Sequence, residues 1–255
     1  MPRIALTREV SESIARCELT HLEREPIDVG RARAQHAAYE SALRTLGCRV
    51  ERVEPAPDDL DSVFIEDTAV VFPELAIITR PGALSRRGET AAVAQTLAPY
   101  RRNVNIQSPG TLDGGDVLVA SRTVFVGQSA RTNARGIEQI RQVASPLGYT
   151  VIGIRVTGCL HLKSAVTEVA EGTLLLQPRW VDPAPFDGFD TIEVDSDDLY
   201  GANALRIGSR VIYPTAFPKT AARLAAHGIS LHFVEADELA KAEGAVTCCC
   251  LMFEA

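Results

Sequence analysis

A hairpin-like pattern recurs along this 255-residue chain and constrains its fold more than any other feature. Each unit joins a short β-branched run, a polar or glycine turn and a second apolar run, as a β-hairpin does. The units begin at Asp67, Gly115, Lys163 and Gly201, so that successive starts lie 48, 48 and 38 residues apart. Helix-like stretches and further short strands follow the hairpins, namely residues 89–97, 133–145 and 220–227 for helices and 150–156 and 231–234 for strands.

A period of roughly 20–50 residues is typical of propellers and other repeat architectures. Residues 245–253 and 3–8 could supply the two strands of a fifth unit, which would bring the two ends of the chain together. We therefore expect an α/β repeat fold, with an ordinary α+β domain of irregular hairpins as the alternative. No linker or abrupt change in composition divides residues 1–255, which we expect to form a single domain.

The charge and the cysteines limit the partners of the chain. Lys and Arg number 26 against 33 Asp and Glu, and the basic residues are scattered, so we expect neither nucleic acid nor a membrane as a partner. No apolar run approaches the roughly 18 residues of a membrane span, and we expect a cytoplasmic protein. The six cysteines form no C-x-x-C pair, so we expect no metal site and reduced thiols. The oligomeric state stays open, with a homodimer among the options.

Polar residues cluster where the repeat units begin. In a propeller, equivalent positions of the units face one central axis, so residues far apart in sequence would converge there. These residues are Asp61, Glu66, Asp67, Thr111, Asp113, Asp116, Cys159, His161, Lys163, Ser164, Tyr200, Asn203, Thr247 and Cys248.

Each of these residues also has a purely structural interpretation. Asp113 before two glycines could serve a turn, His161 could be structural, and Cys248 lies in an apolar segment where a buried, inert thiol is usual. Glu66 and Asp67 could belong to a solvated loop. The other four histidines lie in helical or charged contexts, and we expect them at the surface: His21, His36, His227 and His232.

Taken together, the residues indicate a more specific chemistry. A thiol, an imidazole and a carboxylate are the components of a Cys–His–acid arrangement. Two adjacent acids, Glu66 and Asp67, can bind a planar cation through paired hydrogen bonds. Arginines could hold a carboxylate at the far end of the same molecule, which would then resemble arginine; the candidates are Arg80, Arg86, Arg87 and Arg131.

At these positions the sequence resembles the dimethylarginine dimethylaminohydrolases, members of the amidinotransferase and arginine-deiminase superfamily. The matching stretches are ordered along nearly the whole chain: FIEDTAVV, ITRPGALSRRGE, GTLDGGDVL, ARTNARG, CLHLKS, GANAL and EGAVTCCCL. The resemblance implies the five-bladed ββαβ propeller of that superfamily, called a pentein, with pseudo-fivefold symmetry. This agrees with the repeat described above.

The resemblance also implies a role for each matching residue. Cys248 would be the nucleophile, His161 the general acid and base, and Asp113 the carboxylate that orients it. Cys249 and Cys250 would be structural. Asp67, with Glu66, would bind the guanidinium, Arg86 and Arg131 the α-carboxylate, and Asp61 with the backbone carbonyls near Leu19 and Ala242 the α-ammonium. The match around Leu19 is the loosest, since it needs a one-residue gap.

The implied reaction is hydrolysis of asymmetric dimethylarginine or monomethylarginine to citrulline and an alkylamine, through a covalent S-alkylthiouronium on Cys248 and without a cofactor. Arginine deiminases carry an acid two positions after the catalytic histidine, where this chain has Lys163, which favours a methylated substrate. Deimination, amidino transfer, hydrolysis of another guanidine and a non-catalytic guanidine-binding protein stay as alternatives. Residues 17–24 are a candidate lid.

Overall fold

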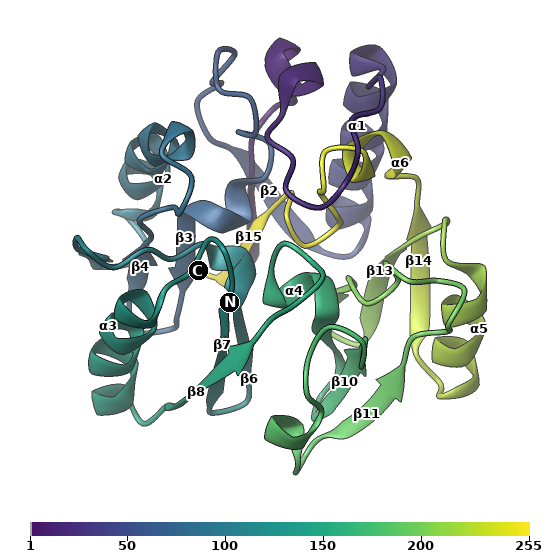
Figure 1. Ribbon diagram of the computed structural model, residues 1–255. Coiled ribbons are helices and arrows are strands. Elements are labelled where there is room, and N and C mark those ends of the chain that lie inside the picture. The colour runs from purple at the N-terminus through teal and green to yellow at the C-terminus, as the bar shows by residue number, and fades with distance from the viewer. Residues whose placement is uncertain (1) are drawn as a thin grey trace.

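The computed structural model describes residues 2–255, and these residues contain five three-stranded sheets. Every sheet contains one antiparallel pair of strands, and its middle strand also pairs in parallel with a third strand. The repeat predicted from the sequence is therefore present, and the five sheets follow one another around the molecule (Figure 1). The sheets comprise β3 (Ala69–Val71), β4 (Ala76–Ile78) and β5 (Asn103–Asn105); β6 (Val117–Ala120), β7 (Thr123–Gln128) and β8 (Thr150–Arg155); β9 (Val166–Ala170), β10 (Thr173–Leu176) and β11 (Asp190–Glu193); β12 (Leu205–Ile207), β13 (Arg210–Pro214) and β14 (Ser230–Val234); and β1 (Arg3–Thr7), β2 (Cys48–Arg52) and β15 (Leu251–Glu254).

The fifth sheet joins the two ends of the chain, as the sequence predicted. Strand β1 pairs antiparallel with β15, with Arg3 opposite Glu254 and Leu6 opposite Leu251. Because β15 directly follows residues 248–250, this pairing places the cysteine run beside the first strand of the chain.

A helix connects the parallel strands in four of the five sheets described for residues 2–255. These helices are α1 (Val29–Thr45), α2 (Thr90–Leu97), α3 (Ala134–Ala144) and α5 (Pro218–Ala226). The third sheet differs, since only a short 3₁₀ turn, Ala184–Phe186, lies between β10 and β11. This difference explains why the third unit spans 38 residues rather than 48, because a parallel connection without a helix needs less chain.

Helix α3 shows how local sequence sets an element. Asn133 caps its first turn, with the side-chain oxygen accepting the Gly136 N–H at 2.9 Å. Ile137 and Ile140 recur at helical spacing and are buried against the second sheet. The predicted helix at 133–145 is confirmed to within one residue at either end.

Helix α1 was not predicted, and it corrects one expectation about the histidines. His36 lies on its inner face with 3% of its surface exposed, so the expected surface position is wrong. Burial lowers the pKa of His36 to about 4, and its Nε2 atom has no hydrogen-bond partner. His36 is thus a neutral core residue, and the buried Tyr39 and Leu43 lie one and two turns further along the same helix.

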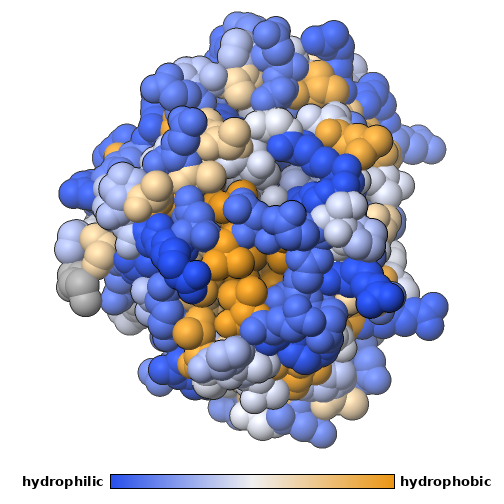
Figure 2. Space-filling view, turned by 90° about the vertical axis from the view of Figure 1, so that its left-hand side faces the viewer, coloured by the Kyte–Doolittle hydropathy of each residue, from blue (hydrophilic) through white to orange (hydrophobic). Residues whose placement is uncertain are grey.

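The face of the molecule drawn in Figure 2 is mostly hydrophilic. Figure 2 shows one face on which a band of hydrophobic side chains is bordered by hydrophilic ones. Among residues 2–255, no helix combines the length and the apolar character that crossing a bilayer requires.

Candidate active site

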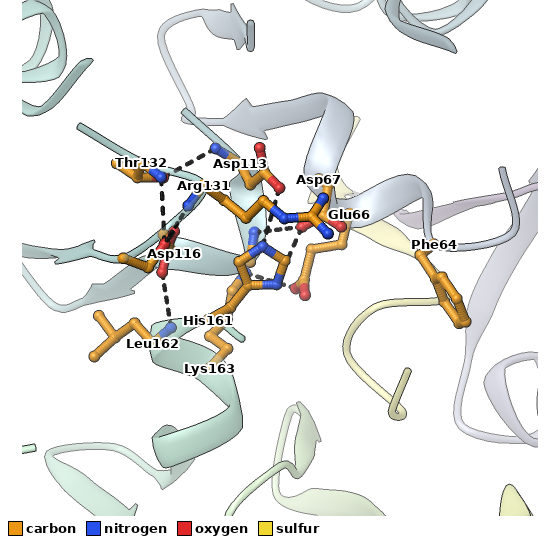
Figure 3. A network of polar contacts seen from close by, with 12 residues as sticks. Phe64, Glu66, Asp67, Asp113, Asp116, Arg131, Thr132, His161, Leu162 and Lys163 are labelled. Atoms are coloured by element: carbon orange, nitrogen blue, oxygen red, sulfur yellow. Dashed lines mark hydrogen bonds and ion pairs between the residues drawn. The ribbon is translucent and has the colours of Figure 1, made fainter. Parts of the chain in front are cut away.

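The centre of the site is a buried pair formed by His161 and Asp113. His161 lies immediately before the short helix α4 (Leu162–Ala165), and its Nε2 atom is 3.0 Å from Asp113 Oδ2. Asp113 is completely buried, and its other oxygen accepts the Gly82 N–H at 2.8 Å. These contacts fix the carboxylate, which in turn fixes the imidazole ring (Figure 3).

The two glycines after Asp113 allow close approach of the chain, rather than only forming a turn. A Cβ atom on Gly115 would lie 2.7 Å from both Asp67 Oδ1 and His161 Nδ1, and one on Gly114 would collide with the Glu66 carbonyl oxygen. The Gly115 N–H instead donates to Asp67 Oδ1 at 2.9 Å. The Gly-Gly pair therefore lets both His161 and Asp67 pack directly against one backbone segment.

Asp67 is paired with a planar cation of the protein itself, the guanidinium of Arg86. Its Oδ2 accepts a hydrogen bond from Arg86, while its Oδ1 lies 3.8 Å from His161 Nδ1. Arg86 also makes a bidentate pair with Glu89 at 3.0 and 2.8 Å, and donates to the carbonyls of Asp61 and Phe64. The expected binding of an α-carboxylate by Arg86 stays a prediction, since its donors face carboxylates and carbonyls here.

Glu66 lies beside Asp67 and faces a different set of partners. Its Oε1 accepts from Lys163 Nζ at 2.6 Å, and its Oε2 accepts from the Thr247 hydroxyl at 2.8 Å. Burial raises the pKa of Glu66, and the Lys163 ammonium opposes that effect. Lys163 thus pairs with one of the two acids that were predicted to bind the guanidinium.

Cys248 lies in a turn at residues 246–249, directly before β15. Its carbonyl accepts the Glu66 N–H at 3.1 Å and its own N–H donates to the Ala245 carbonyl at 3.2 Å. Cys248 is partly exposed, whereas Cys249 and Cys250 are buried in a hydrophobic cluster. The Glu66 contact places the backbone of Cys248 beside the acidic pair.

The electrostatics of the site separate its titratable groups. Burial opposes the charged form of His161, but Asp67, Asp113 and Asp116 outweigh burial and raise its pKa to about 9. Burial opposes the charged form of Asp67 as well, yet His161 and Arg86 lower its pKa to about 2. Burial, Glu66 and Asp67 all raise the pKa of the Cys248 thiol. At neutral pH the site therefore holds an imidazolium, a carboxylate and a neutral thiol.

Asp116 is a buried acid at the site that was placed in the polar cluster but not given a role. It accepts the Leu162 N–H at 2.9 Å and the Ser129 hydroxyl at 2.6 Å. Burial raises its pKa to about 6, against the effect of His161. By holding the backbone directly after His161, Asp116 fixes the start of α4. The only feature of the sequence that could have indicated this role is its position three residues after Asp113 in LDGGD.

The residues predicted to bind the amino-acid end of a substrate lie near the loop at residues 17–24. Asp61 Oδ2 accepts the Glu18 N–H at 3.3 Å, and Arg131 Nη2 lies 3.4 Å from the Thr20 hydroxyl. Ala242 belongs to a buried hydrophobic cluster, and Leu19 and Cys248 both pack against that cluster. These four residues are therefore gathered around one loop, although their roles stay predictions.

Glu243 anchors this loop, a role that the sequence did not predict. Its carboxylate accepts the backbone N–H groups of Thr20, His21 and Leu22, at 2.5 to 3.1 Å. Glu243 adopts a left-handed backbone conformation with φ of 57°. It is adjacent to Ala242 and five residues before Cys248, so the loop is connected to the segment of the thiol.

Asp67, Asp113 and His161 also lie close enough to hold a metal ion, with ligand atoms within 4.8 Å of one another. These atoms already have partners within the protein. Asp67 binds Arg86 and Gly115, and Asp113 binds His161 and Gly82. An ion-pair network accounts for this cluster without a metal.

Comparison with solved structures identifies the class of fold. The N-terminal domain of ArgZ, an arginine dihydrolase from cyanobacteria bound to product, superposes with a TM-score of 0.89 over 99% of this chain and 97% of that chain. At 19% identity this likeness concerns the fold alone. Dimethylarginine dimethylaminohydrolase from Pseudomonas aeruginosa, a cysteine-to-serine mutant complexed with citrulline, superposes with a TM-score of 0.94 at 32% identity, over 99% of this chain and all of that chain. Fold and site together define a hydrolase with an α/β fold of five three-stranded sheets.

The sequence comparisons then identify the family. The family model described as N,N dimethylarginine dimethylhydrolase, eukaryotic, matches residues 15–177. The N(G),N(G)-dimethylarginine dimethylaminohydrolase of Streptomyces coelicolor is 44% identical over 247 residues, which cover 96% of this chain and 94% of that protein. The chain belongs to the dimethylarginine dimethylaminohydrolase family, as the motifs predicted.

Proposed function

We propose that the protein hydrolyses N-ω-methylated arginine to citrulline and dimethylamine or methylamine. The observation that carries this proposal is the buried His161–Asp113 pair beside Asp67. The chain that contains this pair is 44% identical to a dimethylarginine dimethylaminohydrolase. The solved relative from Pseudomonas aeruginosa is complexed with citrulline, the product proposed here.

Asp67 and Glu66 bind the substrate guanidinium in this proposal. The low pKa of Asp67, about 2, supports it, because a carboxylate that stays ionised at neutral pH can bind a planar cation. The present contacts of the two acids with Arg86 and Lys163 must be shared or released when the substrate guanidinium binds. Two adjacent carboxylates orient the planar group so that its central carbon faces the Cys248 sulfur. Holding the thiol and the guanidinium carbon in this geometry supplies much of the rate acceleration.

The bound substrate assists the ionisation of its own nucleophile. Burial and the two acids raise the pKa of the Cys248 thiol, so the unliganded protein holds it protonated. A cation that neutralises Glu66 and Asp67 removes two of these causes and lowers that pKa. The thiol loses its proton to solvent, the thiolate attacks the guanidinium carbon, and a neutral tetrahedral adduct forms.

His161 moves the protons of the reaction. Its pKa of about 9 keeps it protonated at neutral pH, and Asp113 holds Nε2, so that Nδ1 is the atom that faces Asp67. Nδ1 donates its proton to the departing alkylamine, as the C–N bond breaks and the S-alkylthiouronium forms. Neutral His161 then takes a proton from water, which adds to the thiouronium carbon, and citrulline leaves with regeneration of the thiol.

The amino-acid end of the substrate binds beneath residues 17–24. Arg131 binds the α-carboxylate, and Asp61 with the carbonyls near Leu19 and Ala242 accepts the α-ammonium. For Arg86 to share the α-carboxylate, a rearrangement of its present contacts is required. Lys163 occupies one oxygen of Glu66, so fewer carboxylate acceptors remain for the additional N–H donors of an unsubstituted guanidinium, which favours methylated substrates over arginine.

The architecture around this chemistry is part of the same proposal. We infer that the five sheets are the blades of one pseudo-fivefold pentein propeller, which residues 1–255 form as a single domain. We propose a cytoplasmic enzyme that needs no cofactor and has no nucleic-acid or membrane partner. The hydrophobic band in Figure 2 supports association into a homodimer, which light scattering on the purified protein tests.

Mass spectrometry of acid-quenched turnover tests the mechanism. With asymmetric dimethylarginine, we expect a covalent adduct on the peptide that carries Cys248, and citrulline and dimethylamine in equal amounts. A folded protein that forms neither product would contradict the proposal.

A further inference from the structure

Asn203 is a buried amide with hydrogen bonds to the segments of both the nucleophile and the histidine. Its side chain is 3% exposed. The amide nitrogen donates to the Lys163 carbonyl at 2.9 Å and to the Thr247 hydroxyl at 3.0 Å, and the amide oxygen accepts the Thr247 N–H at 3.0 Å. Lys163 is two residues after His161, and Thr247 directly precedes Cys248.

Neither segment has a sheet ladder to fix it. Cys248 lies in the turn at residues 246–249, and His161 lies before a helix of four residues. In such segments the position of a side chain depends on individual hydrogen bonds rather than on strand register. The amide of Asn203 connects the two segments across 84 residues of sequence, the separation of Lys163 from Thr247.

Asn203 is itself held by strands. Tyr213 on β13 donates its hydroxyl to the Gly201 carbonyl at 2.6 Å. Thr167 on β9 donates to the Ala202 carbonyl at 2.6 Å and accepts the Ala204 N–H at 3.2 Å. The backbone on both sides of Asn203 is therefore anchored to sheets, so the direction of its amide is set by the rigid part of the fold.

The contacts continue to the acidic pair. The Thr247 hydroxyl, which accepts from Asn203, donates to Glu66 Oε2 at 2.8 Å. Glu66 in turn donates its N–H to the Cys248 carbonyl at 3.1 Å. The amide thus holds the turn from one side while Glu66 holds it from the other.

We propose that Asn203 is a positioning residue, which sets the distance between the Cys248 thiol and the His161 imidazole by bonding to the backbone beside each. This inference rests on the proposed cysteine-dependent hydrolysis. Asn203 acts through Thr247 and Lys163, so its loss misaligns the reacting groups. Asp67 and Arg131 keep their own contacts and Glu66 keeps its ion pair with Lys163, so substrate binding changes less than turnover.

Asn203→Asp is the test variant, because it keeps the shape and the acceptor but removes both N–H donors and faces a carbonyl with a carboxylate. Gln177→Glu is the matched control, since Gln177 is also 3% exposed and its amide donates to the Leu199 carbonyl at 2.9 Å rather than to Lys163 or Thr247. We expect kcat for asymmetric dimethylarginine to fall about 100-fold in Asn203→Asp, the effect of a misplacement of about 1 Å, with KM within about threefold of wild type. A loss of kcat no greater than that of Gln177→Glu, or a loss confined to KM, would overturn the proposal.

Two further measurements keep the result decisive. If Asn203→Asp does not fold, Thr247→Val removes the hydroxyl and Thr247→Ser retains it, and only the valine variant should lose kcat; equal effects would overturn the inference. If wild type turns over no methylarginine, the proposed function is wrong, but the positioning role of Asn203 can still be tested. The rate at which chloroacetamidine alkylates Cys248 then reports how the thiol and the His161 imidazole are aligned. Slower alkylation with an altered pH profile in Asn203→Asp supports the positioning role, and alkylation unchanged from wild type contradicts it.

Discussion

The Nε2 atom of His161 lies 3.0 Å from Oδ2 of Asp113, a carboxylate with no exposed surface. The two residues are 48 residues apart, the spacing of one repeat unit. Equivalent positions of neighbouring units therefore supply the two halves of one acid–base pair. Charge-assisted hydrogen bonds of this kind both orient an imidazole and stabilise its protonated form.

Asp113→Asn tests that pairing. The substitution keeps the shape of the side chain but removes its charge, so the imidazolium loses its stabilisation and the ring loses its preferred tautomer. We expect kcat to fall by roughly 10²- to 10⁴-fold, the range for general acid–base catalysis. Steady-state kinetics with asymmetric dimethylarginine measures the loss, and a kcat within threefold of wild type would show that the carboxylate is dispensable.

The pH dependence of stability reports on His161. Its pKa rises from 6.5 in the unfolded chain to about 9 in the folded protein. A raised pKa contributes stability that is complete below the unfolded value and is lost as the pH rises through the folded value. We expect the free energy of unfolding in urea to decline between about pH 6.5 and 9, and to decline less in His161→Gln. Parallel curves for the two proteins would contradict this assignment.

Gly115→Ala tests the close approach between the second unit and the site. The added Cβ would meet Asp67 Oδ1 and His161 Nδ1, each at 2.7 Å, and must displace one of them. We expect kcat to fall about 100-fold, since displacements near 1 Å carry such an effect. Gly153→Ala on the exposed part of β8 is the control, because its Cβ would meet only Ile137, at 3.9 Å, and its kinetics should match wild type.

Alkylation tests whether a cation activates Cys248. Burial and the two acids raise the pKa of the thiol, so neutral iodoacetamide should react slowly at pH 7 and faster as the pH rises. Chloroacetamidine carries a planar cation that Asp67 and Glu66 can bind. Relative to glutathione, we expect Cys248 to prefer chloroacetamidine about tenfold or more, a difference of about 1.4 kcal/mol. If Cys248 shows no preference for chloroacetamidine over iodoacetamide, cation binding by Asp67 and Glu66 does not activate the thiol.

The repeat could be predicted from sequence because it is a property of local patterns. The unit starts at Asp67, Gly115 and Lys163 each lie within three residues of the first strand of a sheet. Helix α1 was missed, and with it the burial of His36, because its polar sequence gives only a weak amphipathic pattern. A helix of that kind is recognised by what packs against it, which sequence alone does not show.

The site was predicted less completely than the fold, for a related reason. Cys248, His161 and Asp113 are recognisable by residue type and motif. The roles of Asn203, Glu89 and Glu243 depend on partners that are fixed by tertiary structure: Asn203 bonds to Thr247, 44 residues away, and Glu243 to the Thr20 backbone, 223 residues away. Arg86 was assigned to a substrate carboxylate, but its contacts with Asp67 and Glu89 could be seen only in three dimensions.

The central claim is tested most directly by measuring citrulline release from asymmetric dimethylarginine, monomethylarginine and arginine in parallel, with wild type and Cys248→Ser. We expect release from the methylated substrates, little from arginine, and none from the serine variant, whose circular dichroism should match wild type. Release mainly from arginine would contradict the selectivity assigned to Lys163. Release from methylated substrates that persists in Cys248→Ser would contradict the nucleophile and with it the mechanism.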